Sequence, residues 1–165
     1  MTPEQMQAIV KAHINELKEF KKQDLPIIIG VEAVRHYNKS FVEEGFTDKT
    51  VKKWSNVERR KPESEWYGFS RTNKDRFSQT RTQDKILTGE TTELKNSIHY
   101  VVKADRVTVG SDKPYAAVHQ FGLPAKIFGK KEHIMKARPF IGKSEVLNAA
   151  ITAKIEREIK RILNL

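Results

Sequence analysis

The chain contains no cysteine among its 165 residues. Disulfide bonds, thiolate metal ligands and cysteine nucleophiles are therefore excluded, and the composition favours synthesis in a reducing cytoplasm. No apolar run approaches the ~20 residues needed to cross a bilayer, so we predict no contact with a membrane. The first ten residues carry no basic stretch followed by an apolar block, so we also predict no secretion signal.

What remains is the composition of an ordinary globular protein with an excess of positive charge. Hydrophobic residues make up 38% of the chain and charged residues 32%, which predicts one core and a single domain over residues 1–165. Lys and Arg number 31 against 21 Asp and Glu, for a formal net charge of +10. Such a charge attracts nucleic acid and acidic proteins alike.

The positive charge is concentrated in a segment without sustained periodicity, about residues 46–84, which we predict to be a long basic loop or insertion. Between residues 52 and 81 aromatic side chains are interspersed with cations, as in grooves that bind single-stranded nucleic acid. The alternative is a solvated insertion whose aromatic residues, chiefly Trp54 and Trp66, anchor it to the core or to a neighbouring subunit. The candidate contacts to DNA or to an acidic partner are Arg59, Arg60, Lys61, Arg71, Lys74 and Arg76.

Three helices are predicted. The first begins with a capping box, in which Thr2 is the N-cap, Pro3 the first helical residue and Gln5 the reciprocal partner. The second covers about residues 25–44, although three consecutive isoleucines near its start also suit extended structure. The third follows Ser144, a candidate N-cap. The apolar stripe of the first helix is Met6, Ile9, Val10, His13, Leu17 and Phe20, and that of the third is Val146, Leu147, Ala150, Ile151, Ile155, Ile159, Ile162 and Leu163.

Strand signals lie between the second and third helices. Residues 98–102 and 107–109 alternate in polarity around the polar turn Ala104, Asp105 and Arg106, which predicts a β-hairpin. Leu94 precedes this hairpin at a spacing that suits a short helical turn, and a long loop is expected from Gly122 to Pro139. Amphipathic helices need a surface that covers their stripes. We therefore predict the α+β class, with N- and C-terminal helices packed on a mainly antiparallel sheet.

The sequence contains no catalytic or metal-binding constellation. Gly142, Lys143 and Ser144 resemble the end of a phosphate-binding P-loop, but the pattern requires glycine at position 137, where the chain has alanine. The five histidines show no HExxH spacing, and no GxSxG elbow surrounds a serine. We therefore predict no enzymatic activity, no cofactor and no metal site, and we assign Ser144 to the helix cap.

Three short motifs follow one another between Ile86 and Phe140. They are Leu87-Thr88-Gly89 with Leu94 and Ser97-Ile98; Val109-Gly110-Ser111, Pro114-Tyr115-Ala116 and His119-Gln120-Phe121-Gly122; and Ala137-Arg138-Pro139-Phe140-Ile141-Gly142. In this order they resemble the virion morphogenesis proteins of tailed bacteriophages, a family of tail-completion or neck proteins to which a phage Mu protein belongs. The resemblance covers roughly residues 34–163. This chain departs from the family pattern in the longer spacing between Gly89 and Leu94 and in the longer, more charged segment 54–84.

The resemblance implies a structural phage or prophage protein without catalytic activity. It implies a homo-oligomeric ring in the neck or at the head-proximal end of the tail, made in the bacterial host cytoplasm. The implied partners are portal, adaptor or tail-tube proteins and the DNA that passes through the neck. The alternative function is a basic nucleic-acid-binding protein that uses residues 52–81. Candidate subunit or partner contacts, with packing inside the molecule as the alternative, are Tyr115, His119, Phe121, Arg138 and Phe140.

Overall fold

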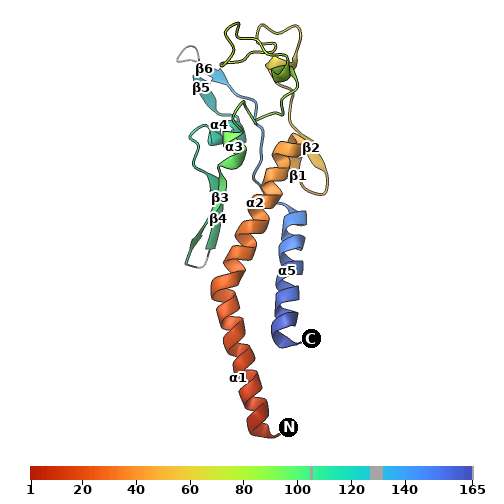
Figure 1. Ribbon diagram of the computed structural model, residues 1–165, viewed down its shortest axis with the longest axis vertical. Coiled ribbons are helices and arrows are strands. Elements are labelled where there is room, and N and C mark those ends of the chain that lie inside the picture. Colours follow the sequence, from red (N-terminus) through yellow and green to blue (C-terminus); the bar gives the residue numbers. More distant parts are fainter. Residues whose placement is uncertain (105, 127–131, 165) are drawn as a thin grey trace. The chain divides into compact units, whose positions relative to one another are not determined.

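The computed structural model describes residues 1–104, 106–126 and 132–164, and Figure 1 shows its ribbon. The chain divides into two compact units. Unit 1 consists of Met1–His36, His99–Val109 and Ser144–Leu165. Unit 2 consists of Tyr37–Ile98 and Gly110–Lys143. The predicted α+β class is confirmed, because helices at both ends of the chain accompany short antiparallel strands.

The chain begins with a long helical stretch. Helix α1 (Pro3–Glu19) starts at the predicted capping box, in which Thr2 Oγ1 accepts from the Gln5 amide and Gln5 Oε1 accepts from the Thr2 amide. The π-helical turn η1 (Phe20–Asp24) joins α1 to α2 (Leu25–Glu43), so the three elements run on without interruption (Figure 1). Pro26 explains the wider turn, because its ring clashes with the carbonyl four residues earlier in a regular α-helix. The isoleucines after it are helical.

Unit 1 contains helix α1, the first part of α2, helix α5 (Glu145–Leu163) and most of a β-hairpin. Helix α5 begins at Ser144, whose hydroxyl accepts from the Leu147 amide at 3.1 Å, which confirms the predicted cap. Helix α5 contacts α1, and Lys154 of α5 forms an ion pair with the buried Glu32 of α2. Strands β3 (Ile98–Lys103) and β4 (Arg106–Ser111) form the predicted hairpin, and Asp105 of its turn lies outside the described residues.

The hairpin of unit 1 lies against α2 at a glycine. A Cβ atom at Gly30 would come within 2.2 Å of the Tyr100 ring, so no larger residue fits between the helix and β3. On α1, by contrast, the apolar stripe is covered at one end only. Phe20 is buried, whereas Met6, Ile9 and Val10 of the stripe, and Ile14 one turn after Val10 at its edge, are between 46% and 55% exposed.

The core of unit 2 is a cluster of three aromatic rings. The Phe41 ring on α2 lies 5.2 Å from the Phe140 ring and 5.9 Å from the Trp54 ring, measured between centroids. All three side chains are buried. The Trp54 indole N–H also donates to the Pro139 carbonyl at 2.8 Å. The third sequence motif is therefore part of the core, and Trp54 anchors the basic segment to it, as predicted.

The remaining elements of unit 2 are short. They are the antiparallel pair β1 (Gly45–Thr47) and β2 (Val51–Lys53), the 3-10 turns η2 (Glu58–Arg60) and η3 (Thr80–Thr82), helices α3 (Glu93–Asn96) and α4 (Ala116–Phe121), and the antiparallel pair β5 (Pro124–Lys126) and β6 (Glu132–Ile134). The prediction of uninterrupted loops over 46–84 and 122–139 is therefore wrong at β1–β2 and β5–β6. Strands of three residues are too short to show an alternating pattern. Within the described residues the strands form three separate two-stranded sheets.

Candidate functional site

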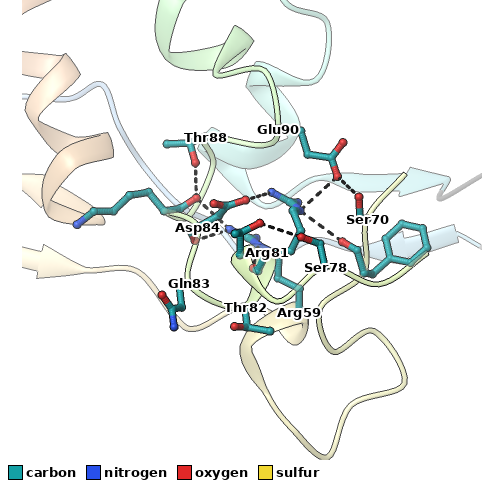
Figure 2. A network of polar contacts seen from close by, with 12 residues as sticks. Arg59, Ser70, Ser78, Arg81, Thr82, Gln83, Asp84, Thr88 and Glu90 are labelled. Atoms are coloured by element: carbon teal, nitrogen blue, oxygen red, sulfur yellow. Dashed lines mark hydrogen bonds and ion pairs between the residues drawn. The ribbon is translucent and has the colours of Figure 1, made fainter. Parts of the chain in front are cut away.

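The basic segment is folded around its own arginines (Figure 2). Arg59 donates through Nε to the Arg81 carbonyl at 3.1 Å, and through Nη2 to the carbonyls of Asp84 and Lys85 at 2.8 and 2.9 Å. Burial lowers the pKa of Arg59 to about 10, with smaller contributions from the neighbouring Arg81 and Arg60 cations. The guanidinium thus stays charged at neutral pH and joins two parts of the segment that are distant in sequence.

A second arginine pairs with a carboxylate at the end of α2. Arg60 donates through Nη1 and Nη2 to the two oxygens of Glu44, at 3.2 and 2.5 Å. Glu44 Oε1 also accepts from the Ile86 amide at 2.6 Å. Burial raises the pKa of Glu44, but the bonds from Arg60 and Ile86 outweigh burial and leave this pKa below its ordinary value. Glu44 therefore connects α2, η2 and the start of the first motif.

Arg81 completes this network. Its Nη1 lies 2.7 Å from Asp84 Oδ2, and its Nε lies 3.4 Å from Glu90 Oε1. The same Glu90 oxygen accepts from the Ser70 hydroxyl at 2.8 Å, as Figure 2 shows. Because Glu90 directly follows the first motif, the network holds that motif against the basic segment.

The six cations predicted to contact DNA or an acidic partner divide into two groups. Arg59 and Arg60 are held inside unit 2 by the bonds above, and Lys61 is half-buried in an ion pair with Glu58 at 2.6 Å. Arg71, Lys74 and Arg76 are exposed. The second group is therefore the more accessible to a large partner, and contact with DNA or an acidic protein stays a prediction for all six.

The aromatic residues of the basic segment also fall into a buried group and a partly exposed group. Trp54 is buried in the core, whereas Trp66 is 37% exposed and lies edge to face on Phe69, with ring centroids 5.2 Å apart. Phe77 is likewise partly exposed and packs on Tyr67. Trp66 thus packs within the segment, whereas the sequence predicted that it would be a second anchor beside Trp54.

The second and third motifs are held side by side by main-chain and amide bonds. The Arg138 amide donates to the His119 carbonyl at 2.7 Å. Gln120 accepts from the amides of Phe140 and Ile141 at 3.0 and 3.2 Å and donates to the Ile141 carbonyl at 2.7 Å. Gly122 adopts φ +69°, and a Cβ there would come within 2.9 Å of the Met135 carbonyl oxygen and the Ala137 amide nitrogen. Sequence reasoning missed Gln120, although it lies inside the second motif.

The structure separates the five candidate contact residues. Arg138 and Phe140 are buried; Arg138 donates through Nε and Nη2 to the carbonyls of Ser55 and Asn56, at 3.2 to 3.4 Å. Both side chains therefore act inside unit 2. Tyr115 and Phe121 are exposed, and His119 is half-buried. Contact with another subunit stays a prediction for these last three residues.

All three motifs and the basic segment meet at one recess of about 280 Å³. A second hollow of about 600 Å³ shares Gly89, Thr91, Glu93, Tyr115 and His119 with it. The Nδ1 atom of His119 is buried and makes no hydrogen bond to any described residue. Burial, and then the Arg138 cation, lower the pKa of His119, so the imidazole is neutral at neutral pH. The recess is lined by Val57, Arg59, Leu87, Thr88, Gly89, Thr91, Glu93, Leu94, Tyr115, His119, Met135 and Arg138.

The turn of the first motif carries backbone strain at this recess. Leu87 and Thr92 adopt φ values of 62° and 54°, in the left-handed region that favours glycine, and Gly89 adopts 63°. The longer spacing before Leu94 is accommodated by these left-handed residues and by α3, which buries the Leu94 side chain. Strained positions of this kind cluster at binding sites and switch regions.

A comparison with protein families matches residues 55–160 to the phage virion morphogenesis family. The chain belongs to this family. The match begins at the basic segment and includes all three motifs and most of α5. Helix α1 of this virion morphogenesis protein lies outside the match, so its role has to be argued from the structure. No curated protein and no solved structure matches the chain.

The described residues of this virion morphogenesis protein hold no group of three or more His, Asp or Glu side chains that could bind a metal ion. In the same residues, no helix is long and apolar enough to span a bilayer. What the site offers is the arginine network, the recess and the hollow that adjoins it.

Proposed function

We propose that this virion morphogenesis protein is a structural, non-enzymatic subunit of the phage neck that self-associates into a ring. In this role it joins head to tail or completes the head-proximal end of the tail, next to portal, adaptor or tail-tube proteins. Family membership supports a part in virion assembly. The observation that carries self-association is the uncovered apolar stripe on α1.

The exposed part of the α1 stripe continues from a part that is already packed inside the chain. Helix α5 contacts α1, and Phe20 at the end of the stripe is buried. Towards the N-terminus the same stripe is exposed at Met6, Ile9, Val10 and Ile14. Contiguous exposed apolar surface of this kind marks an interaction site. The charges of α1 nearly balance, with two Lys against three Glu, which disfavours an anionic membrane surface as the partner.

A ring needs a head-to-tail contact whose rotation closes. Exposed apolar residues of unit 2 supply further surface for such a contact, because Phe121, Leu123 and Ile134 are all exposed. Leu123 and Ile134 lie on adjacent segments, where the Pro124–Ile134 pair joins β5 to β6. Unit 1 and unit 2 thus each expose apolar residues, and a heterologous contact pairs two different surfaces of the same chain.

Two glutamates on the α1 stripe should dissociate the assembly. We expect the wild-type protein to form oligomers whose mass in solution increases with concentration, and the double variant Ile9→Glu/Ile14→Glu to be monomeric with unchanged helix content. The matched control is Ala8→Glu/Asn15→Glu, which adds the same charges to exposed positions on the other side of α1. Light scattering coupled to size-exclusion chromatography measures the masses. A monomeric wild type, or equal dissociation of both double variants, would contradict the proposal.

Direct binding of nucleic acid is the second candidate function. It is favoured by the exposed Arg71, Lys74 and Arg76, which lie in the segment that also exposes Trp66 and Phe77. Cations beside exposed rings suit phosphate contact with base stacking.

The charge-neutralised variant Arg71→Gln/Lys74→Gln/Arg76→Gln tests this second function. If these residues bind single-stranded DNA, the slope of log affinity against log salt should become shallower by about 2, since each lost contact removes roughly 0.7. Fluorescence anisotropy with labelled oligothymidylate measures this slope. A monomeric wild type with tight, salt-sensitive DNA binding would favour this function over the ring, whereas weak binding that the variant leaves unchanged would exclude it.

A further inference from the structure

Three nitrogen-bearing side chains at the recess retain unused hydrogen-bonding capacity. Arg59 and Arg138 each use Nε and Nη2 for their carbonyl bonds, which leaves Nη1 without a hydrogen bond to any described residue. His119 Nδ1 has none either, although it is buried. All three side chains line the same recess of about 280 Å³. Of these three atoms only His119 Nδ1 is both buried and unpaired, a state that is rare for polar atoms in folded proteins. The Nη1 groups of Arg59 and Arg138 are open to solvent and therefore to a ligand in the recess.

The rest of the recess constrains the shape of that ligand. Its walls include the apolar side chains of Val57, Leu87, Leu94 and Met135. The one acidic side chain in the lining, Glu93, is half-exposed and is engaged by Lys113 and by the Tyr115 hydroxyl, each at 3.4 Å. The recess thus offers two guanidinium groups and an imidazole between apolar walls.

We propose that this recess binds the carboxylate of an aspartate or glutamate side chain from a partner protein. Guanidinium groups form their strongest hydrogen bonds with carboxylate and phosphate groups. A glutamate side chain ends in its charged group, so it can enter by the tip while its methylenes contact the apolar walls. A phosphodiester of DNA carries a sugar on either side, so it has no terminal charged group of this kind to insert. The site is complete within one chain, so it does not depend on ring assembly.

Saturation-transfer NMR on the full-length protein tests the site, since it observes the small ligand whatever the size of the assembly. The probes are N-acetyl-glutamate N-methylamide, the corresponding glutamine derivative, inorganic phosphate and oligothymidylate. We expect saturable binding of the glutamate derivative, and little or none of the glutamine derivative. Competition of the glutamate derivative by oligothymidylate, or tighter binding of phosphate, would overturn the assignment to a carboxylate.

Variants at Thr91 localise the binding, because this exposed residue lines the recess and is not part of the core. Thr91→Glu places a tethered carboxylate at the recess and should weaken binding of the free glutamate derivative at least about tenfold, as expected for a charge-assisted bond. Thr91→Gln has the same size without the charge and should retain most of the affinity. His119→Phe, which keeps a ring but removes Nδ1, should also weaken binding. No saturable binding to the wild type, or equal effects of Thr91→Glu and Thr91→Gln, would overturn the proposal.

Discussion

Replacing Phe140 by alanine should lower the free energy of unfolding by about 3–5 kcal/mol, the usual cost of removing a fully buried aromatic ring. Phe140 is only 2% exposed, and its ring contacts Phe41, which also contacts Trp54. The change therefore leaves a cavity between α2, the basic segment and the third motif. Urea denaturation followed by circular dichroism at one fixed protein concentration measures the effect.

Phe121 supplies a matched control within the same stretch of sequence. It is 67% exposed, so Phe121→Ala should change the free energy of unfolding by no more than about 0.5 kcal/mol. Phe121→Ala is instead expected to weaken self-association, if the exposed ring contacts a second subunit. Equal destabilisation by the two alanine variants would show that Phe140 is not part of the core.

Replacing Arg60 by glutamine should cost about 2–3 kcal/mol, because it leaves the half-buried Glu44 carboxylate without its cation. Glu44 would keep only the Ile86 amide and the more distant charge of Lys85. The control is Arg76→Gln, a change of the same chemistry at an exposed position, which should be nearly neutral. Denaturant unfolding compares the two variants directly.

The cost of Arg60→Gln should also depend on pH in a defined direction. The pKa of Glu44 in the folded protein lies below its ordinary value of 4.5. A carboxylate with a depressed pKa stabilises the fold above its unfolded pKa, and that stability is lost as the pH falls through the folded pKa. The difference between wild type and Arg60→Gln should therefore shrink as the pH is lowered below about 4.5. A cost that stays constant over this range would mean that the Glu44–Arg60 pair contributes little.

Helix boundaries were readable from the sequence because their signals are local. Thr2 and Gln5 cap α1, and Ser144 caps α5, through bonds that span three residues. The Ile98–Val109 hairpin was predictable because the alternation over residues 98–102 is long enough to stand out, and the shorter run 107–109 follows it directly after a polar turn. Strands β1, β2, β5 and β6 have three residues each, and a pattern of that length does not stand out from chance.

The candidate site was harder to predict from the sequence, because its main hydrogen-bond acceptors are backbone carbonyls. Arg59 and Arg138 bind main-chain oxygens far away in sequence, and a carbonyl has no residue type that could reveal it. The sequence therefore could not distinguish these inward-facing arginines from the exposed Arg71 and Arg76. Gln120 was missed for the same reason, since two of its three partners are amides and the third is a carbonyl. The three motifs were correctly singled out, but their convergence on one recess required coordinates.

The π turn between α1 and α2 sets the direction in which the apolar stripe of α1, the proposed contact surface, faces. Adding or removing a single residue there would rotate the α1 stripe by about 100° around the helix axis, the angle between successive residues of an α-helix. Every residue of the family-matched part, 55–160, would stay unchanged. The residues that set the direction of the α1 stripe are thus different from the residues that form the arginine network and the recess. Changes confined to Phe20–Asp24 would therefore turn the proposed contact surface of α1 and leave the residues of the recess as they are.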